Sequence, residues 1–352
     1  MAKFGQSGRD NECDYLCVDA FMADAVGARA LASAFETGLV DDLLRLQSGA
    51  AADIAARLRL EPRGLGLLLG MLRANGVLIV DGDGDFCFSA EFTAALRFRD
   101  LIEAKLDFCR LVAPDFFELF TTLLAAPQAF FERARLFELF AYQRCFDATP
   151  ENVAMTARWV GITTALTRHE APVVLRRHDF SPFRRMLDIG GNSGEFALQV
   201  CRRHPSLEAT VCDLPLVCDF GAAHVGAEPE AGRISFLRAG REPAALPRGF
   251  DLVTFKSMLH DWPDAQTDAF LARAHAALES GGRLLIFERG AFDLGAQGEG
   301  QLPYSLIPVV LFFRSYRPAA DYVARLQRIG FRDIRVETVM LEMPFMLITA
   351  SR

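Results

Sequence analysis

The stretch Met186-Leu-Asp-Ile-Gly-Gly-Asn-Ser-Gly194 decides the fold of this chain. Its apolar start predicts a buried strand, and Asp188 lies near the end of that strand. Gly190 and Gly191 then leave space for a tight turn, because glycine has no Cβ and tolerates positive φ. A helix is predicted to follow over Glu195–His204. A strand, a glycine turn and a helix in this order predict a site where the backbone approaches a nucleotide-like ligand.

The spacing of the glycines narrows the kind of ligand. The chain has Gly190-x-Asn192-x-x-Glu195, which does not match the dinucleotide pattern G-x-G-x-x-G. A pyrophosphate is therefore not the expected ligand. An acid beside the glycines instead suits a ligand with a cationic or amino-bearing end.

Length and charge limit the class of protein. The chain has 352 residues, enough for two domains, and 51% of them are hydrophobic. A formal net charge of −7 opposes bulk attraction to nucleic acid or an anionic membrane. The start of the chain has no apolar signal core, and the stretch Ser305–Phe313 is too short to span a bilayer. We expect a cytoplasmic protein with reduced cysteines, no metal site, and neither a nucleic-acid nor a membrane partner.

The first hundred residues predict a winged-helix outline, in which helices are followed by a β-hairpin. The fourth helix is rich in Leu, Gly and Met, so we expect it to be buried rather than to read DNA, which needs polar side chains on an outer face. The expected helices are Ala25–Thr37, Val40–Gln47, Ala51–Leu58 and Glu61–Asn75, and the expected hairpin strands are Val77–Val80 and Phe86–Phe88, joined by a turn at Asp81–Asp85.

Residues 101–170 predict helices throughout, and from about residue 180 strands and helices alternate, as in α/β proteins. Three domains or segments are therefore expected: an N-terminal extension (1–19), a helical, winged-helix-like domain (20–175) and an α/β domain (176–352). The expected helices of the middle part are Leu101–Leu111, Phe116–Leu124, Phe130–Phe146 and Met155–Leu166. The later strands are expected at Ala209–Cys212, Ile234–Leu237, Phe250–Phe255, Arg283–Phe287, Ile334–Val339 and Phe345–Ala350.

Further polar residues follow the strands of the α/β half. Asp213 ends the second strand, about 25 residues after Asp188, where a carboxylate can accept both ribose hydroxyls of a nucleoside. His260 lies just past a buried strand and can take a proton near neutral pH, and Trp262 can stack on an adenine. Glu288 ends the next strand, where it can hold an imidazole in its base tautomer.

Four motifs of this chain resemble those of the plant-type (caffeate/isoflavone-like) S-adenosylmethionine (SAM)-dependent small-molecule O-methyltransferases, a family that includes bacterial members. The motifs, which match in order and in spacing, are Leu187–Gly194, Cys212–Pro215, Lys256–Asp264 and Gly281–Glu288. The resemblance covers roughly residues 20–350. It implies an α/β Rossmann-like SAM-binding domain that binds SAM and releases S-adenosylhomocysteine. It also implies an N-terminal all-helical, winged-helix-like domain that forms a homodimer.

The resemblance also implies roles for single residues. His260 matches the general base and Glu288 its partner. The implied cofactor-binding residues are Asp188, Gly190, Gly191, Asn192, Asp213, Leu214, Gly240, Arg241, Lys256 and Trp262. Residues expected to contact a small-molecule acceptor are Tyr142, Arg144, Met155, Trp159, Tyr304, Phe313, Arg314 and Tyr316.

Two departures from the family pattern leave the acceptor open. The acid that usually reaches adenine is absent from Arg238-Ala-Gly-Arg-Glu242, where Glu242 is a possible substitute. The family's Glu-Arg-Thr segment is here Tyr316-Arg317-Pro318, so the base lacks a second acid. The leading hypothesis is O-methylation of a hydroxyl. One alternative is S-methylation of a thioether hydroxy acid of the 4-methylthio-2-hydroxybutyrate type, as in dimethylsulfoniopropionate synthesis, which needs no base. Arg144, Arg314 and Arg317 would then hold its carboxylate. Another is a SAM-binding, non-catalytic regulator.

Overall fold

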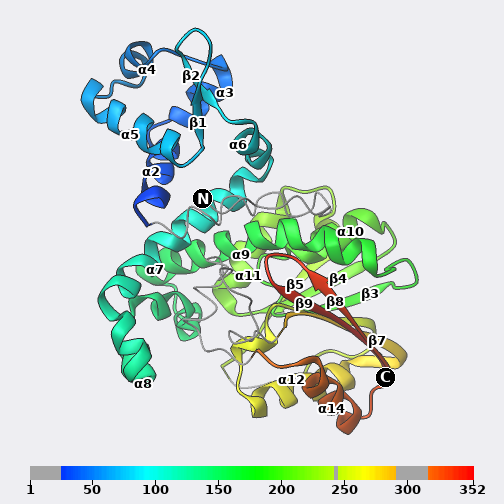
Figure 1. Ribbon diagram of the computed structural model, residues 1–352. Helices are drawn as coiled ribbons and strands as arrows, with labels where there is room; N and C mark the ends of the chain where they lie inside the picture. The colour runs from blue at the N-terminus through cyan, green and yellow to red at the C-terminus, as the bar shows by residue number, and fades with distance from the viewer. Residues whose placement is uncertain (1–24, 242–244, 291–315) are drawn as a thin grey trace. The chain divides into compact units, whose positions relative to one another are not determined.

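The computed structural model describes residues 25–241, 245–290 and 316–352, which form two compact units. The described residues up to Leu136 make the first unit, and those from Phe137 onward make the second (Figure 1). The division precedes helix α9 (Pro150–Arg177), which packs on helices of the second unit. The expected boundary at 175/176 falls within the last turn of this helix.

The first unit has the predicted order of helices followed by a hairpin. The carboxylate of Asp81 accepts the N–H groups of Asp83 and Asp85, so this acidic run is the tip of the hairpin. The elements are α2 (Ala25–Glu36), α3 (Leu39–Leu46), α4 (Ala51–Leu58), α5 (Pro62–Ala74), β1 (Leu78–Val80), β2 (Phe86–Phe88), α6 (Ala90–Ala95), the 3-10 turn η2 (Leu96–Phe98), α7 (Arg99–Ala125) and α8 (Pro127–Arg133).

Helix α5 is buried on one face only, so the expectation of a buried helix is wrong for its other face. Leu65, Leu69 and Leu72 are buried, whereas Leu67 is 68% exposed. A Cβ added at Gly70 would meet no atom within 4 Å. The helix therefore packs as an amphipathic surface helix, with leucines at helical spacing on its inner face.

The segment between α7 and α9 also corrects the sequence-based expectation. The two helices expected before residue 125 form the single helix α7, and the helix expected over Phe130–Phe146 ends at Arg133. Two 3-10 turns, η3 (Arg135–Phe140) and η4 (Tyr142–Phe146), replace its remainder. The buried carboxylate of Asp115 accepts the N–H of Leu136 at 2.7 Å, a donor that a continuing α-helix would have used internally.

The second unit is a seven-stranded sheet in the order β5-β4-β3-β6-β7-β9-β8. The first five of these strands are parallel, and β9 runs antiparallel to both of its neighbours. The strands are β3 (Arg185–Ile189), β4 (Glu208–Asp213), β5 (Ile234–Arg238), β6 (Phe250–Lys256), β7 (Leu278–Arg289), β8 (Arg332–Met340) and β9 (Pro344–Ser351).

Helices cover both faces of this sheet. Helices α9, α10 (Glu195–Arg203) and α11 (Pro215–Gly226) lie on one face, and α12 (Asp264–Ala277) and α14 (Ala319–Ile329) lie on the other (Figure 1). Short 3-10 turns occur at η5 (Ala231–Arg233) and η6 (Leu259–Asp261). The chain order reverses between β3 and β6, and open α/β sheets bind ligands outside the carboxyl ends of strands at such a reversal.

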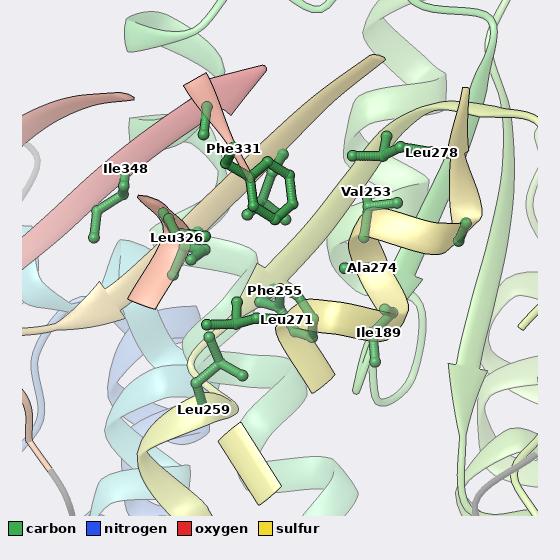
Figure 2. Close-up of a cluster of buried hydrophobic side chains, with 14 of the residues drawn as sticks. Ile189, Val253, Phe255, Leu259, Leu271, Ala274, Leu278, Leu326, Phe331 and Ile348 are labelled. Carbon is green, nitrogen blue, oxygen red and sulfur yellow. The ribbon is translucent and has the colours of Figure 1, made fainter. Parts of the chain in front are cut away.

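A contiguous hydrophobic core lies on the α12 and α14 side of the sheet. Ile189, Val253 and Phe255 of the sheet pack with Leu271 of α12 and Leu326 of α14 (Figure 2). The fold is therefore Rossmann-like, as predicted. In the part of the chain that the structure describes, no helix combines the length and apolar character needed to cross a membrane.

Candidate active site

The turn after β3 requires glycine at two adjacent positions. Gly190 has φ +70°, and a Cβ there would lie 2.4 Å from Cγ of Met258. A Cβ on Gly191 would lie 2.5 Å from Oδ2 of Asp188 and 2.8 Å from Cγ1 of Val211. The main chain therefore packs directly against its protein neighbours at the reversal of strand order, while the approach of a ligand to this turn stays a prediction.

Asp188 is fully buried beside this turn. Its Oδ1 accepts the hydroxyl of Thr254 at 2.6 Å, whereas Oδ2 has no hydrogen-bond partner among the described residues. Burial raises the pKa of Asp188 to about 6. An unpaired, buried carboxylate oxygen is a position that a cationic group would stabilise, so the site fits a ligand with an amino group or sulfonium.

Asp213 joins the end of β4 to the glycine turn. Its Oδ2 accepts the N–H of Asn192 and its Oδ1 accepts the N–H of Leu214, both at 2.7 Å. Burial raises the pKa of this carboxyl to about 6 as well. A carboxylate has about four acceptor positions, so two remain for the ribose hydroxyls that the sequence analysis assigned to it.

Helix α9 supports the turn through two threonines that the sequence analysis missed. Thr163 donates to Oδ1 of Asn192 at 3.0 Å, and Thr164 donates to Oγ of Ser193 at 2.7 Å. Asn192 has φ +55°, a left-handed conformation that asparagine tolerates. The sequence shows two adjacent hydroxyl side chains at 163 and 164, but their partners become visible only when α9 packs against the glycine turn.

His260 and Glu288 come together as predicted. Nδ1 of His260 lies 2.5 Å from Oε1 of Glu288, and because a carboxylate only accepts, Nδ1 carries the proton. Oε2 of Glu288 faces the N–H groups of Met258, Leu259 and His260 at 3.1, 3.0 and 3.4 Å. One buried acid therefore holds both the ring and the main chain of the turn η6.

The second ring nitrogen of His260 also faces an acid. Its Nε2 lies 3.3 Å from Oδ1 of Asp261, whose Oδ2 accepts the hydroxyl of Tyr142. Burial alone would lower the pKa of His260, but the charges of Glu288 and Asp261 outweigh burial and raise that pKa above 6.5. Asp261 supplies a second carboxylate beside the imidazole, where the sequence analysis expected none because of Tyr316.

Lys256 points toward a buried acid that the sequence analysis did not consider. Its ammonium pairs with Glu170 of α9 and lies 3.2 Å from the hydroxyl of Thr167. Arg289 binds the other oxygen of Glu170 at 2.9 Å. Burial would raise the pKa of Glu170, but these two cations outweigh it and lower that pKa below its usual range. This ion cluster ties α9 to the ends of β6 and β7.

Aromatic rings surround Tyr142. Its ring centroid lies 5.2 Å from that of Trp159 and 6.1 Å from that of Trp262. Tyr316 stacks on the ring of His260 at a centroid distance of 5.2 Å and an angle of 15°. Met155 is half-buried on α9. Of the expected acceptor and cofactor residues, Tyr316 thus lies on the imidazole and Tyr142 lies against its neighbour Asp261, while Trp159 and Trp262 pack beside Tyr142.

Arg144 and Arg241, the two arginines among the expected site residues that the structure describes, both bind other protein groups. Arg144 donates to the main-chain carbonyls of Glu138 and Leu139 at 2.6 and 2.5 Å. Arg241 binds Asp147 at 2.9 Å beside the exposed Gly240. Tyr304, Phe313, Arg314 and Glu242 lie outside the described residues. Within the described ranges, no group of three or more His, Cys, Asp or Glu side chains could hold a metal ion.

Residues 124–332 match the O-methyltransferase domain family, and the chain belongs to this family. O-demethylpuromycin-O-methyltransferase of Streptomyces alboniger is 29% identical over 327 residues, which cover 88% of this chain and 82% of that protein. 3-Hydroxy-5-methyl-1-naphthoate 3-O-methyltransferase of Streptomyces sahachiroi is 38% identical over 130 residues, 37% of each chain. Acetylserotonin O-methyltransferase of Bos taurus is 37% identical over 48% of each chain. The last two alignments span less than half of the relative's length.

Solved structures agree with the fold. Human N-acetylserotonin methyltransferase in complex with SAM superposes with a TM-score of 0.74 at 21% identity and covers 99% of both chains. The SAM-dependent methyltransferase SibL in its apo form gives a TM-score of 0.68 at 26% identity over 93% of this chain and 96% of the other. The similarity thus extends over both units of the chain.

Proposed function

We propose that this protein is a SAM-dependent O-methyltransferase that acts on a hydroxyl group of a small metabolite, with His260 as general base. The observation that carries the proposal is the pair formed by His260 and Glu288. Glu288 keeps the proton on Nδ1, so Nε2 of the neutral ring carries the electron pair that can accept a proton from a hydroxyl, and Asp261, 3.3 Å from Nε2, stabilises the imidazolium that results.

The glycine turn supports the cofactor assignment. Gly190 and Gly191 let the turn pack tightly against Met258, Asp188 and Val211 at the carboxyl end of the strand. Asp188 offers an unpaired carboxylate oxygen to a cation, and Asp213 has acceptor positions for a ribose. When bound, SAM supplies an electrophilic methyl group on a sulfonium. The residues of this chain would orient the acceptor in line with that group, exclude water and remove the hydroxyl proton.

The pKa of His260 sets the pH dependence of the reaction. Because this pKa is raised above 6.5, the imidazole is protonated at low pH and gains its base form as the pH rises through the raised value. For the wild-type enzyme we therefore expect kcat/KM to rise with pH, with a midpoint above 6.5.

The test is His260→Ala with the same acceptor. Turnover should fall by roughly 10²-fold or more, because general-base catalysis contributes on that order, and SAM binding by calorimetry should persist. His275→Ala is the control, since this histidine packs on Phe331 at the far end of α12. Near-normal turnover of His260→Ala, or a flat pH profile in the wild type, would remove the base role.

No specific observation favours thioether S-methylation or a non-catalytic regulator. Thioether methylation needs no base, yet the imidazole is fixed in its base tautomer by a buried acid. Of the arginines assigned to the substrate carboxylate, Arg144 and Arg317 donate instead to main-chain carbonyls. A non-catalytic regulator would not need a buried imidazole held by a carboxylate, as His260 is by Glu288.

Our proposal includes a homodimer and a cytoplasmic location. Phe117, Phe120 and Leu124 project from one face of α7 at spacings of three and four residues and are 73%, 38% and 70% exposed. An exposed apolar stripe of this kind supports a partner surface. The cysteines of the described ranges are unbridged, which supports a reducing compartment.

A further inference from the structure

The turn that carries His260 is held from two sides by opposite charges. Glu288 accepts from the N–H groups at its start, as described above. On the other side, Arg317 donates from Nη1 to the carbonyl of Leu259 at 3.1 Å and from Nη2 to the carbonyl of Trp262 at 2.7 Å. These two carbonyls lie immediately before and two residues after His260 in the chain.

Arg317 is itself firmly held. It is only 5% exposed, and its Nε donates to Oδ1 of Asp264, the first residue of α12, at 2.9 Å. The guanidinium thus bridges two main-chain carbonyls and a carboxylate with a rigid fork of donors, which a lysine ammonium cannot reproduce. Tyr316, the preceding residue, stacks on the imidazole. A segment far along the chain therefore contacts both the ring and the main chain of the turn.

We propose that Arg317 is a positioning residue for His260, acting through the main chain of residues 259–262. The guanidinium fixes the turn so that the imidazole stays against Glu288 and Asp261. Without Arg317, the turn would lose the charged hydrogen bonds at the carbonyls of Leu259 and Trp262 but keep those to Glu288. The imidazole ring would then move relative to the carboxylates that face it. This inference rests on the proposed function for its effect on turnover, but not for its effect on His260 itself.

The charged groups that face His260 decide whether loss of Arg317 raises or lowers the pKa of the imidazole. Burial and the charge of Arg289 of β7 lower the pKa of His260, but Glu288 of β7 and Asp261 of η6 together outweigh them and favour the imidazolium. Tyr316 stacks on the ring, and the hydroxyl of Tyr142 of η4 binds Asp261 beside it. Because the acids dominate, a looser turn weakens their hold on the proton. The pKa of His260 should then fall toward 6.5.

The experiment compares the wild type with Arg317→Lys, which keeps the charge but loses the fork. The titration of His260 is followed by NMR of the imidazole nitrogens, assigned with His260→Ala among the chain's six histidines. We expect the titration midpoint to move to lower pH and kcat to fall about 10- to 100-fold, a size that misplacement of a catalytic group produces. SAM affinity should stay near the wild-type value.

Arg325→Lys is the matched control. Arg325 is also buried and binds Asp264 and Asp268, but none of its hydrogen bonds in the described structure reaches the main chain of residues 259–262. It should leave the His260 titration unchanged. Asp264→Asn is a milder second variant, because its side chain is 69% exposed and it removes only one partner of Arg317; it should move the titration less and in the same direction.

An unmoved His260 titration in both Arg317→Lys and Asp264→Asn would overturn the positioning role, whatever happens to kcat. An equal shift in Arg325→Lys would overturn it too, because the effect would then belong to the whole ion network. A shifted titration in a protein that transfers no methyl group would instead refute the proposed function and support the role of Arg317.

Discussion

Two buried aspartates determine the electrostatics of the glycine turn. The carboxyls of Asp188 and Asp213 both have a pKa of about 6 because burial penalises their charged forms. Asp213 has its charge partly compensated by two main-chain N–H groups, but Asp188 has one oxygen without a partner in the described structure. Asp188 therefore has the most to gain from a cationic ligand.

We predict that SAM affinity rises with pH through about 6 and levels off above it. A cationic ligand favours the carboxylate, so binding below that pH must release protons from the raised acids. Asp188→Asn should flatten this rise and weaken binding by roughly 10-fold or more at pH 7.5, since a charged hydrogen bond is worth about 1.5–3 kcal/mol. Calorimetry from pH 5 to pH 7.5 measures both effects.

Asp53→Asn on the surface of α4 is the control for that series and should follow the wild-type curve. A pH-independent affinity in the wild-type protein would contradict the assignment of a cation to Asp188.

At the scale of the element, the turn between β3 and α10 is fixed by what surrounds its glycines. The obstacle to a side chain at Gly191 is a buried strand residue, Val211, and a buried carboxylate, neither of which can move away cheaply. The helix α5 offers the opposite case, because Gly70 faces open space.

Gly191→Ala should reduce SAM affinity by about 100-fold or more, because the Cβ would displace the turn that the ligand contacts. The matched control, Gly70→Ala, should bind SAM normally and be more stable by about 0.5–1 kcal/mol, since alanine is the better helix former. Calorimetry and urea unfolding measure the two quantities. Normal SAM binding by Gly191→Ala would show that the ligand does not lie against this turn.

Sequence reasoning succeeded where the determinant is local. The strand β3, its glycines and the pair of His260 and Glu288 follow from apolar runs, from residues without a Cβ and from the order of strand ends. It failed where the determinant is a distant contact. The helix expected over Phe130–Phe146 is interrupted because Asp115, 21 residues before Leu136, takes its N–H. The roles of Thr163 and Arg317 depend likewise on the packing of α9 and on the segment before α14.

At the scale of the whole molecule, the proposed dimer depends on the apolar stripe of α7. Burying Phe117 and Leu124 against a second copy would gain roughly 1.5–3 kcal/mol for each side chain. The double variant Phe117→Asp with Leu124→Asp should therefore be monomeric, as measured by analytical ultracentrifugation, whereas the wild type should be dimeric. Leu67→Asp on α5, an equally exposed leucine, should stay dimeric. A monomeric wild type, or a dimeric double variant, would contradict the proposal.

The order of strands has a consequence for how the protein is made. The final strand β9 lies between β7 and β8, and its Met346 pairs with Glu288 in the sheet. Synthesis proceeds from the N-terminus, so β7 and β8 leave the ribosome before the strand that joins them. The strand that bears the acid paired with His260 thus keeps an open edge until β9 emerges. A chain that stops before β9 has the glycine turn and the histidine but lacks the strand that pairs with β7 beside Glu288, so transfer activity should begin only once β9 has been made and inserted.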